Sequence, residues 1–252
     1  MSMRLCSESF QRRVVAALSL GFFLGTALVV LADEPGCVVF EEDFENGADK
    51  WTPTDPSAWK IKKTEDGNVY SLFKDSEYSP PHTSPLNIAW LEDVELGDFE
   101  ATLRVRSNTH DYGHRDLCFF LGYQDPARFY YCHLANRGDD RANQIFIVNN
   151  AARVKISEKT TEGTPWNDKW HTVKIVRKLG DGLIEVYFDN MEEPIMVAHD
   201  TTHGRGKFGI GSFDDAGDFD DIRIVRLEES TAAVEPVRRW RRLRLFGRRR
   251  NR

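Results

Sequence analysis

Apolar and polar residues alternate along the middle of the chain with the two-residue period of half-buried β-strands. The clearest case is residues 99–106, FEATLRVR, where every second side chain is apolar and those between are charged or carry a hydroxyl. The same alternation is present at residues 184–189 and, less regularly, at residues 170–177. Each such strand is expected to turn one face to a core and the other to solvent. Further strand candidates are residues 38–44, 118–123, 129–135, 144–149, 207–213 and 219–227.

The segments between these strands are rich in Gly, Pro, Asn and Asp, and no convincing amphipathic helix lies among them. The nearest helical candidate, residues 86–95, is short and bounded by Pro85 and Gly97. About ten to twelve short strands without crossover helices predict an all-β, two-sheet antiparallel β-sandwich. A body of roughly 200 residues in one piece suits two large sheets packed face to face. The first and last strands should then lie side by side, since neither would remain an exposed edge.

Four segments near the end of this region share a pattern: WHTVKIVR at 170–177, IEVYFDN at 184–190, GKFGIGSF at 206–213 and FDDIRI at 219–224. They resemble the C-terminal half of a laminin-G-like domain, and the opening FEEDFENG at 40–47 is similar to its first strand and turn. Over residues 38–227 the chain therefore resembles the concanavalin A-like lectin and glucanase superfamily, which implies a jelly-roll sandwich. The superfamily includes lectins, carbohydrate-binding modules, glycosidases and polysaccharide lyases, so the resemblance leaves the activity open.

The segment 1–32 is typical of an export signal. Arg12 and Arg13 precede an uncharged run, positions 14–32, that ends in the small-x-small sequence Val30-Leu31-Ala32. An uncleaved membrane anchor is the alternative, because a run of this length can span a bilayer with its arginines held inside. Both interpretations predict a secreted, periplasmic or cell-envelope protein.

The net charge of −6 averages three unlike segments. The leader carries three Arg and one Glu and the segment 238–252 carries nine Arg and no acid, so positions 33–237 keep 22 bases and 39 acids, a net charge of −17. An acidic body of this kind argues against nucleic-acid binding at the folded domain. The Arg-rich end is either a solvated tail or a short amphipathic anchor on an anionic surface. We therefore divide the chain into a signal or anchor at 1–32, a jelly-roll domain at 33–229 and a tail at 230–252.

Two cysteines, Cys118 and Cys132, flank an expected hairpin. They face each other only if the loop is centred on Asp125, and a change of one residue in loop length moves them apart. A disulfide is therefore one interpretation, and a buried reduced pair is the one that we prefer.

Polar and aromatic side chains suited to sugar hydroxyls and ring faces gather at residues 110–116, HDYGHRD. A solvated loop, with Asp116 capping the turn, and a zinc site are the alternatives there, but so few ligands in one loop without Cys indicate zinc only loosely. The strand YYCH at 130–133 must turn one face to the core. If Tyr130 and Cys132 point inward, Tyr131 and His133 form a platform outside; in the opposite register His133 is a core residue.

Two tryptophans are distinguished by position: Trp166 follows Gly and Pro in a loop and is expected to stack on a sugar, whereas Trp170 is expected in the core. The predicted ligand is a polysaccharide or other glycan. The predicted ligand-binding residues are Arg104, Arg106, His110, Tyr112, His114, Arg115, Tyr131, His133, Gln144 and Trp166.

The same residue types would serve a polysaccharide lyase, which needs a His or Tyr base and a cation or amide beside the uronic carboxylate. Phe146, however, stands where the Gln-Ile-His strand of alginate lyases requires His. Glu41, Asp43 and Glu45 approach the glucanase motif but lie in the opening strand rather than in mid-sheet. No catalytic residue is assigned. Carbohydrate binding is the preferred function, with a lyase and a cell-envelope structural protein as alternatives.

Acidic residues at both ends of the domain predict a structural calcium ion. In the superfamily that the chain resembles, calcium often lies where the carbonyls of the first turn meet an Asp of the last strand. Hard oxygen ligands of this kind suit the ion. The implied ligands are Asp43, Gly47 and Asp220, and surface acids without a metal are the alternative.

Overall fold

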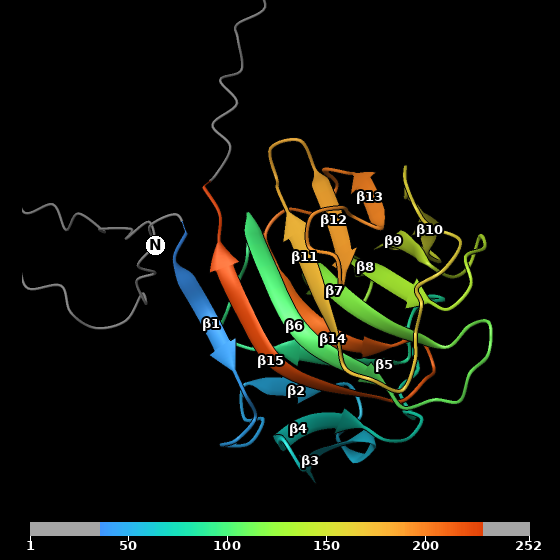
Figure 1. Cartoon of the computed structure of the whole chain (residues 1–252). Helices are drawn as coiled ribbons and strands as arrows, with labels where there is room; N and C mark the ends of the chain where they lie inside the picture. The colour runs from blue at the N-terminus through green and yellow to red at the C-terminus, as the bar shows by residue number, and fades with distance from the viewer. Residues whose placement is uncertain (1–35, 229–252) are drawn as a thin grey trace, which may run out of the picture.

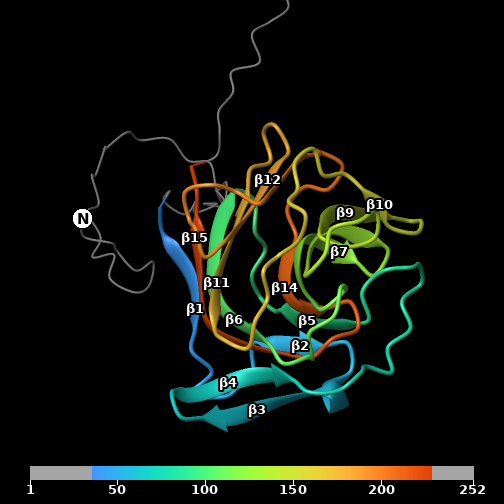
Figure 2. The ribbon, with the colours of Figure 1, turned by 45° about the vertical axis from the view of Figure 1, so that its right-hand side comes forward.

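The computed structural model describes residues 36–228, which form two antiparallel sheets packed face to face (Figures 1 and 2). The predicted all-β sandwich is confirmed. A single 3-10 turn, η1 (Pro56–Ala58), is the one helical element among the described residues, and no helix there is long and apolar enough to cross a membrane. The predicted signal or anchor at 1–32 and the tail at 230–252 lie outside the described residues.

Sheet A has eight strands and follows the order β13-β12-β11-β6-β15-β4-β3, with β1 also paired to β15. One edge of β15 is paired with β6, and the other edge is paired first with β4 and then with β1. The first and last strands are thus neighbours, as predicted. The strands are β1 (Val38–Glu42), β3 (Trp59–Thr64), β4 (Gly67–Leu72), β6 (Phe99–Ser107), β11 (His171–Arg177), β12 (Leu183–Phe188), β13 (Met196–His199) and β15 (Gly217–Arg226).

Sheet B has seven strands in the order β10-β9-β8-β7-β14-β5-β2. Its strands are β2 (Trp51–Pro53), β5 (Asn87–Leu91), β7 (Asp116–Asp125), β8 (Arg128–Ala135), β9 (Gln144–Asn149), β10 (Val154–Lys155) and β14 (Lys207–Ser212).

The core lies between the sheets and follows the alternation in the sequence. In β6 the apolar positions from Phe99 to Val105 are at most 1% exposed, while Arg104 and Arg106 lie on the outer face of sheet A. In β8 Tyr130 and Cys132 belong to the same core. Each large apolar side chain buried here contributes about 1.5–3 kcal/mol of transfer free energy.

A second apolar layer covers the outer face of sheet B. It is protected by the covering segment, residues 73–86, which is the long teal loop between β4 and β5 in Figure 2. Backbone bonds from Leu86 N to Phe213 O (3.0 Å) and from Arg153 N to Thr83 O (3.1 Å) hold this segment against its neighbours. The layer consists of Ile88, Trp90, Cys118, Phe120, Phe129, Tyr131, Phe146 and Val148, with Tyr123 and Phe213 packed against it.

The β7–β8 hairpin settles the arrangement of the two cysteines. Cys118 pairs with His133 and Phe119 with Cys132, so the two thiols point to opposite faces of the sheet. Both are free and buried, which confirms the reduced interpretation. The register arises from an irregularity between Leu121 and Asp125 that includes Gly122, whose φ of 62° few other residues adopt.

Candidate functional site

The alternation in β8 fixes which side chains reach the outer face of sheet B. Because Tyr130 and Cys132 face the core, Tyr131 and His133 point outward, as the first of the two predicted registers requires. Neither is an exposed platform, however, since both are buried beneath neighbouring segments. Tyr131 instead stacks on Phe146 with ring centroids 5.1 Å apart.

Three loops meet at one end of this face: residues 108–115, 136–143 and 213–216, which we call the loop end of sheet B. The Tyr112 hydroxyl donates to Asp215 Oδ2 (2.9 Å), which joins the first loop to the third. His114 Nε2 lies 3.0 Å from Asp139 Oδ2, which joins the first loop to the second. The exposed His110 ring stacks on Tyr112 with centroids 5.2 Å apart. These contacts hold aromatic and imidazole groups at the surface.

Gln144, another predicted ligand residue, lies at the start of β9 below the same loops. Its Nε2 donates to the backbone oxygen of Asp139 (3.0 Å), and its side chain is buried. Gln144 therefore supports the loop from beneath.

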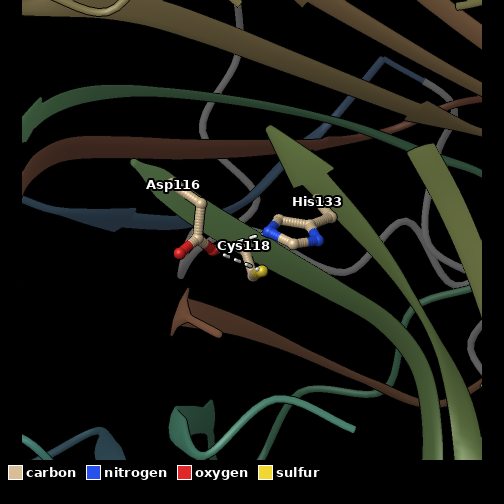
Figure 3. A group of neighbouring side chains, drawn as sticks. All are labelled: Asp116, Cys118 and His133. Carbon is tan, nitrogen blue, oxygen red and sulfur yellow. Dashed lines mark hydrogen bonds and ion pairs between the residues drawn. The ribbon is translucent and has the colours of Figure 1, made fainter. Parts of the chain in front are cut away.

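A buried polar cluster lies under the loop end, formed by Asp116, Cys118 and His133 (Figure 3). Asp116 and Cys118 are two residues apart on β7, and His133 is directly opposite Cys118 on β8. The Cys118 thiol donates to Asp116 Oδ2 (3.2 Å), as does the backbone N–H of Phe213 (2.8 Å). His133 Nε2 lies 3.1 Å from the same oxygen.

Two further carboxylates border this cluster. Asp215 Oδ2 accepts the backbone N–H of Asp116 (2.7 Å), and Asp214 is exposed to solvent. Burial, followed by the negative charge of Asp116, raises the pKa of Asp215 to about 7. Burial alone would raise the pKa of Asp116 too, but the charge of His133 and the hydrogen bonds to the carboxylate hold it below its usual value.

Arg153, which lies just before β10, covers part of the outer face of sheet B. Arg153 Nη1 donates to the Tyr131 hydroxyl (2.7 Å), and its guanidinium lies over the rings of Phe146 (4.7 Å) and Phe213 (4.4 Å). Arg153 and Phe213 are both partly exposed. They form the margin between the buried layer and the loop end.

Four predicted ligand residues are not part of the exposed surface of the loop end. Arg104 and Arg106 are on the outer face of sheet A, where both guanidinium groups lie over the Trp170 ring. Arg115 is buried, and its guanidinium donates to Ser107, to the Asn167 carbonyl and to Asp168. Arg115 therefore ties two loops together and is not free to bind a ligand. The fourth residue is Trp166.

Each of the two tryptophans lies in surroundings other than those predicted. Trp166 is only 6% exposed, donates its indole N–H to the Leu134 carbonyl (2.8 Å) and packs edge-on against Phe188. The predicted stacking face is thus absent at Trp166. Trp170, expected in the core, is partly exposed between Arg104 and Arg106.

The predicted calcium ligands lie at the β1–β15 edge of sheet A. An open hollow of about 430 Å³ is lined there by Glu41, Glu42, Asp43, Asn46, Asp221, Ile222 and Arg223. Asp220 is buried beside it, and burial, with the charges of Asp221 and Asp43, raises its pKa to about 6. Gly47 has a φ of 103° in the turn that follows β1. Of the three predicted calcium ligands only Asp43 lines the hollow itself. The other oxygen donors there come from Glu41, Glu42, Asn46 and Asp221, and such hard donors are the ligands that calcium takes.

No protein-family model matches the chain, and no curated protein matches it either. Solved structures do match its fold. The carbohydrate-binding module CBM66 of Bacillus subtilis has a TM-score of 0.50 at 16% identity, over 70% of this chain and 95% of that one. The chain has the jelly-roll sandwich fold.

Two further structures support the same assignment. Domain 4 of AbnA, an extracellular arabinanase of Geobacillus stearothermophilus, gives a TM-score of 0.50 at 13% identity, over 77% of this chain and 94% of that one. The cellulose induced protein Cip1 gives 0.50 at 13% identity, over 74% and 96%. At these identities the similarity establishes the fold.

Several residues at the loop end could not be singled out by sequence reasoning. Asp116 resembles a turn cap in the sequence, and Cys118 resembles a disulfide candidate. Arg153, Phe213 and Asp215 carry no pattern in the sequence that separates them from ordinary loop and strand residues. The i, i+2 spacing of Asp116 and Cys118 is a usable signal, because it places both side chains on one face of a strand.

Proposed function

We propose that this domain binds a carbohydrate at the loop end of sheet B. The observation that carries the proposal is the surface pair His110 and Tyr112, which stack on each other in the loop that also carries His114. Tyr112 is fixed by Asp215, and His114 by Asp139. Rings that are apolar on their faces and polar at their edges suit the pyranose ring and its hydroxyls. The fold is shared with a carbohydrate-binding module and with a domain solved in complex with arabinotriose.

The loop end is also organised before any ligand arrives. The Tyr112 hydroxyl is fixed by Asp215 and the His114 ring by Asp139. Side chains that are already held lose little conformational entropy on binding, and this saves about 0.5–1.5 kcal/mol for each. The partly exposed Phe213 and Arg153 extend the surface toward the covering segment.

The test begins with the full chain on a glycan array, followed by calorimetry on the strongest ligand. His114→Ala should weaken binding at least tenfold, because His114 borders the proposed site. His199→Ala is the matched control: His199 is similarly exposed and lies 3.0 Å from Glu158, but on strand β13 of the other sheet. We expect the control to bind within twofold of the original protein. An array without any bound glycan, or equal losses in both variants, would refute the proposal.

We further propose that the protein acts outside the cytoplasm and that calcium binds at the β1–β15 hollow. The sequence pattern of residues 1–32, which predicts an export signal or an anchor, supports the first part. The acidic lining of the hollow and the buried Asp220 support the second. The Arg-rich tail is proposed to bind an anionic surface, and its deletion should release the protein from cells that retain it.

A polysaccharide lyase is the second candidate function. The observation that favours it is the grouping of Tyr131, His133 and Arg153 on one sheet face, with Arg153 bonded to the Tyr131 hydroxyl. These are the residue types that proton abstraction beside a uronic carboxylate needs, and because Tyr131 and His133 are buried, a lyase would have to uncover them to meet a polymer. Incubation with uronic-acid polymers should then produce the ultraviolet absorbance of unsaturated sugars, and its absence across a broad panel would remove this candidate.

A further inference from the structure

We propose that Asp116, Cys118 and His133 bind a zinc ion beneath the loop end of sheet B. Each residue offers one donor atom, and these three atoms lie within 4.8 Å of one another. The set contains a carboxylate oxygen, a sulfur and an imidazole nitrogen, which are the donors that zinc takes in proteins. The inference is independent of carbohydrate binding, because the metal needs none of the surface residues at the loop end.

The β7–β8 hairpin places the three side chains without help from a flexible loop. Asp116 and Cys118 point the same way because they are two residues apart on one strand, and His133 is the cross-strand partner of Cys118. Figure 3 shows the imidazole turned from β8 toward the two β7 side chains. Ligands on paired strands are held more accurately than ligands on loops.

The imidazole has the arrangement of a metal ligand. His133 Nδ1 lies 3.1 Å from the backbone oxygen of Arg141 and is placed to donate its proton there. When the ring binds the ion, it keeps the proton on Nδ1 and releases the one on Nε2, so that the Nε2 lone pair faces the metal. A backbone carbonyl behind the distal nitrogen is the usual support of a zinc-bound histidine.

Asp116 Oδ1 is buried and has no hydrogen-bond partner, and His133 Nε2 makes no well-aligned hydrogen bond although it lies 3.1 Å from Asp116 Oδ2. Asp116 is fully buried and His133 is 4% exposed, so water does not replace the missing partners at the surface. Leaving such a group without a partner costs about 1–3 kcal/mol. A cation between the carboxylate and the imidazole would satisfy both residues.

The distances suit zinc with little movement. Bonds of about 2.0 Å to oxygen and nitrogen and about 2.3 Å to sulfur place neighbouring ligands of a tetrahedron roughly 3.3–3.5 Å apart. Asp116 Oδ2 lies 3.1 Å from His133 Nε2 and 3.2 Å from Cys118 Sγ. These two pairs need a shift of a few tenths of an ångström, and the third pair, Cys118 Sγ and His133 Nε2, lies within 4.8 Å. Binding of the ion would release the thiol proton.

The donor set also distinguishes zinc from calcium, since thiolate and imidazole are poor ligands for a hard cation. Three protein ligands leave a fourth position open. A second group of carboxylates, Asp116, Asp214 and Asp215, shares Asp116 with the cluster. Asp214 is exposed, whereas Asp215 and Asp116 are buried, so this row of carboxylates extends from the surface to the cluster. Its negative charge attracts cations.

The experiment measures zinc in the full chain, purified without a metal-affinity tag, stripped with a chelator and reloaded. We expect one zinc per chain by mass spectrometry of the metal, and near-ultraviolet thiolate absorbance when cobalt(II) replaces it. Cys118→Ala should remove that absorbance and weaken zinc binding by roughly a hundredfold or more, beyond the 10–100-fold typical of losing an outer-shell partner. Cys132→Ala is the matched control, because Cys132 is the other buried free thiol and faces the opposite side of the sheet.

Zinc bound equally by both cysteine variants, or less than one tenth of an equivalent in the original chain, would overturn the proposal and leave a simple ion pair between Asp116 and His133. If Cys118→Ala fails to fold, the cobalt spectrum of the original chain decides, since absence of thiolate absorbance is equally decisive. His110→Ala separates this inference from the proposed function: it should lose glycan binding and keep its zinc.

Discussion

The buried carboxylate of Asp218 offers a quantitative test of how the outer face of sheet A is stabilised. Its Oδ2 accepts from Arg106 Nη2 (2.7 Å) and from Lys62 Nζ (3.0 Å), and its side chain is fully buried. We expect Asp218→Asn to lower the free energy of unfolding by about 2–3 kcal/mol. The two cations would then face an amide that carries no charge.

The magnitude follows from the exposure of the partners. Each pair is worth about 4 kcal/mol before desolvation at an effective dielectric constant near 20, and removing one member of a buried pair costs about 3–5 kcal/mol. Arg106 and Lys62 remain 26% and 37% exposed, so water partly replaces the lost carboxylate and reduces the cost to the lower end or slightly below it. For a domain of this size the change corresponds to a Tm lower by about 4–12 °C.

Urea denaturation followed by tryptophan fluorescence, with thermal unfolding by circular dichroism, measures the change. Asp221→Asn is the control on the same strand: Asp221 pairs with Arg104 at 3.0 Å, but 51% of its side chain is exposed. Exposed pairs contribute about 0–1 kcal/mol, so the control should unfold almost as the original protein does. The reasoning fails if Asp218→Asn changes stability by no more than an ordinary surface substitution, about 0.5 kcal/mol. It also fails if Arg106→Met shows no coupling to Asp218→Asn in a double-mutant cycle.

Three further predictions concern other parts of the domain. Trp166→Phe should lower the free energy of unfolding by about 1–3 kcal/mol, because the buried carbonyl of Leu134 loses its hydrogen-bond donor. The affinity for glycans should stay unchanged, and a loss of affinity would show that Trp166 belongs to the binding site after all. Burial lowers the pKa of His203 below 6.5, so below pH 6.5 the unfolded chain binds a proton that the folded chain does not. Stability should therefore fall between pH 7.5 and pH 5, and less steeply in His203→Gln; parallel urea profiles would contradict this. Calcium at about a hundredfold over its Kd should add about 2.7 kcal/mol of stability in thermal unfolding, an effect that Asp220→Asn should abolish and that an unchanged Tm would exclude.

Strands could be predicted from the sequence where one face is buried in the core and the other is in contact with water, because their residues then alternate. β6 is recognisable because one face lies in the core and the other in water. β5 has no alternation, since Ala89 and Leu91 face the core while Ile88 and Trp90 lie in the second apolar layer. Periodicity does not separate such a run from a short helix. The covering segment, which is bonded to Phe213 and Arg153 beside the second layer, has no period of its own and could not be predicted.

The residues of the candidate site could not be predicted in full, because their positions depend on how the strands are paired and the amino-acid sequence alone does not reveal this pairing. The irregularity around Gly122 brings Cys118 opposite His133, whereas the register of the pair Asp125 and Arg128, continued without it, would place Cys118 opposite Ala135. The outward position of Trp170 could have been predicted. Val173 and Ile175 point to the core, and Trp170 lies an odd number of residues from both, so its side chain belongs to the opposite face of the strand. The position of Trp166 could not be predicted, since the carbonyl that accepts its indole proton belongs to Leu134, far away in the sequence.

The pairing of β1 with β15 also determines how the domain is presented to its surroundings. Gly36 N bonds to Arg226 O, so the chain enters and leaves the sandwich at neighbouring points (Figure 1). The loop of residues 213–216 lies at the other end of β15, which has ten residues and so extends roughly 30 Å at about 3.3 Å per residue. A support attached through either terminus would therefore hold the sandwich at one end of β15. The loop end of sheet B, at the other end of this strand, would point away from the support.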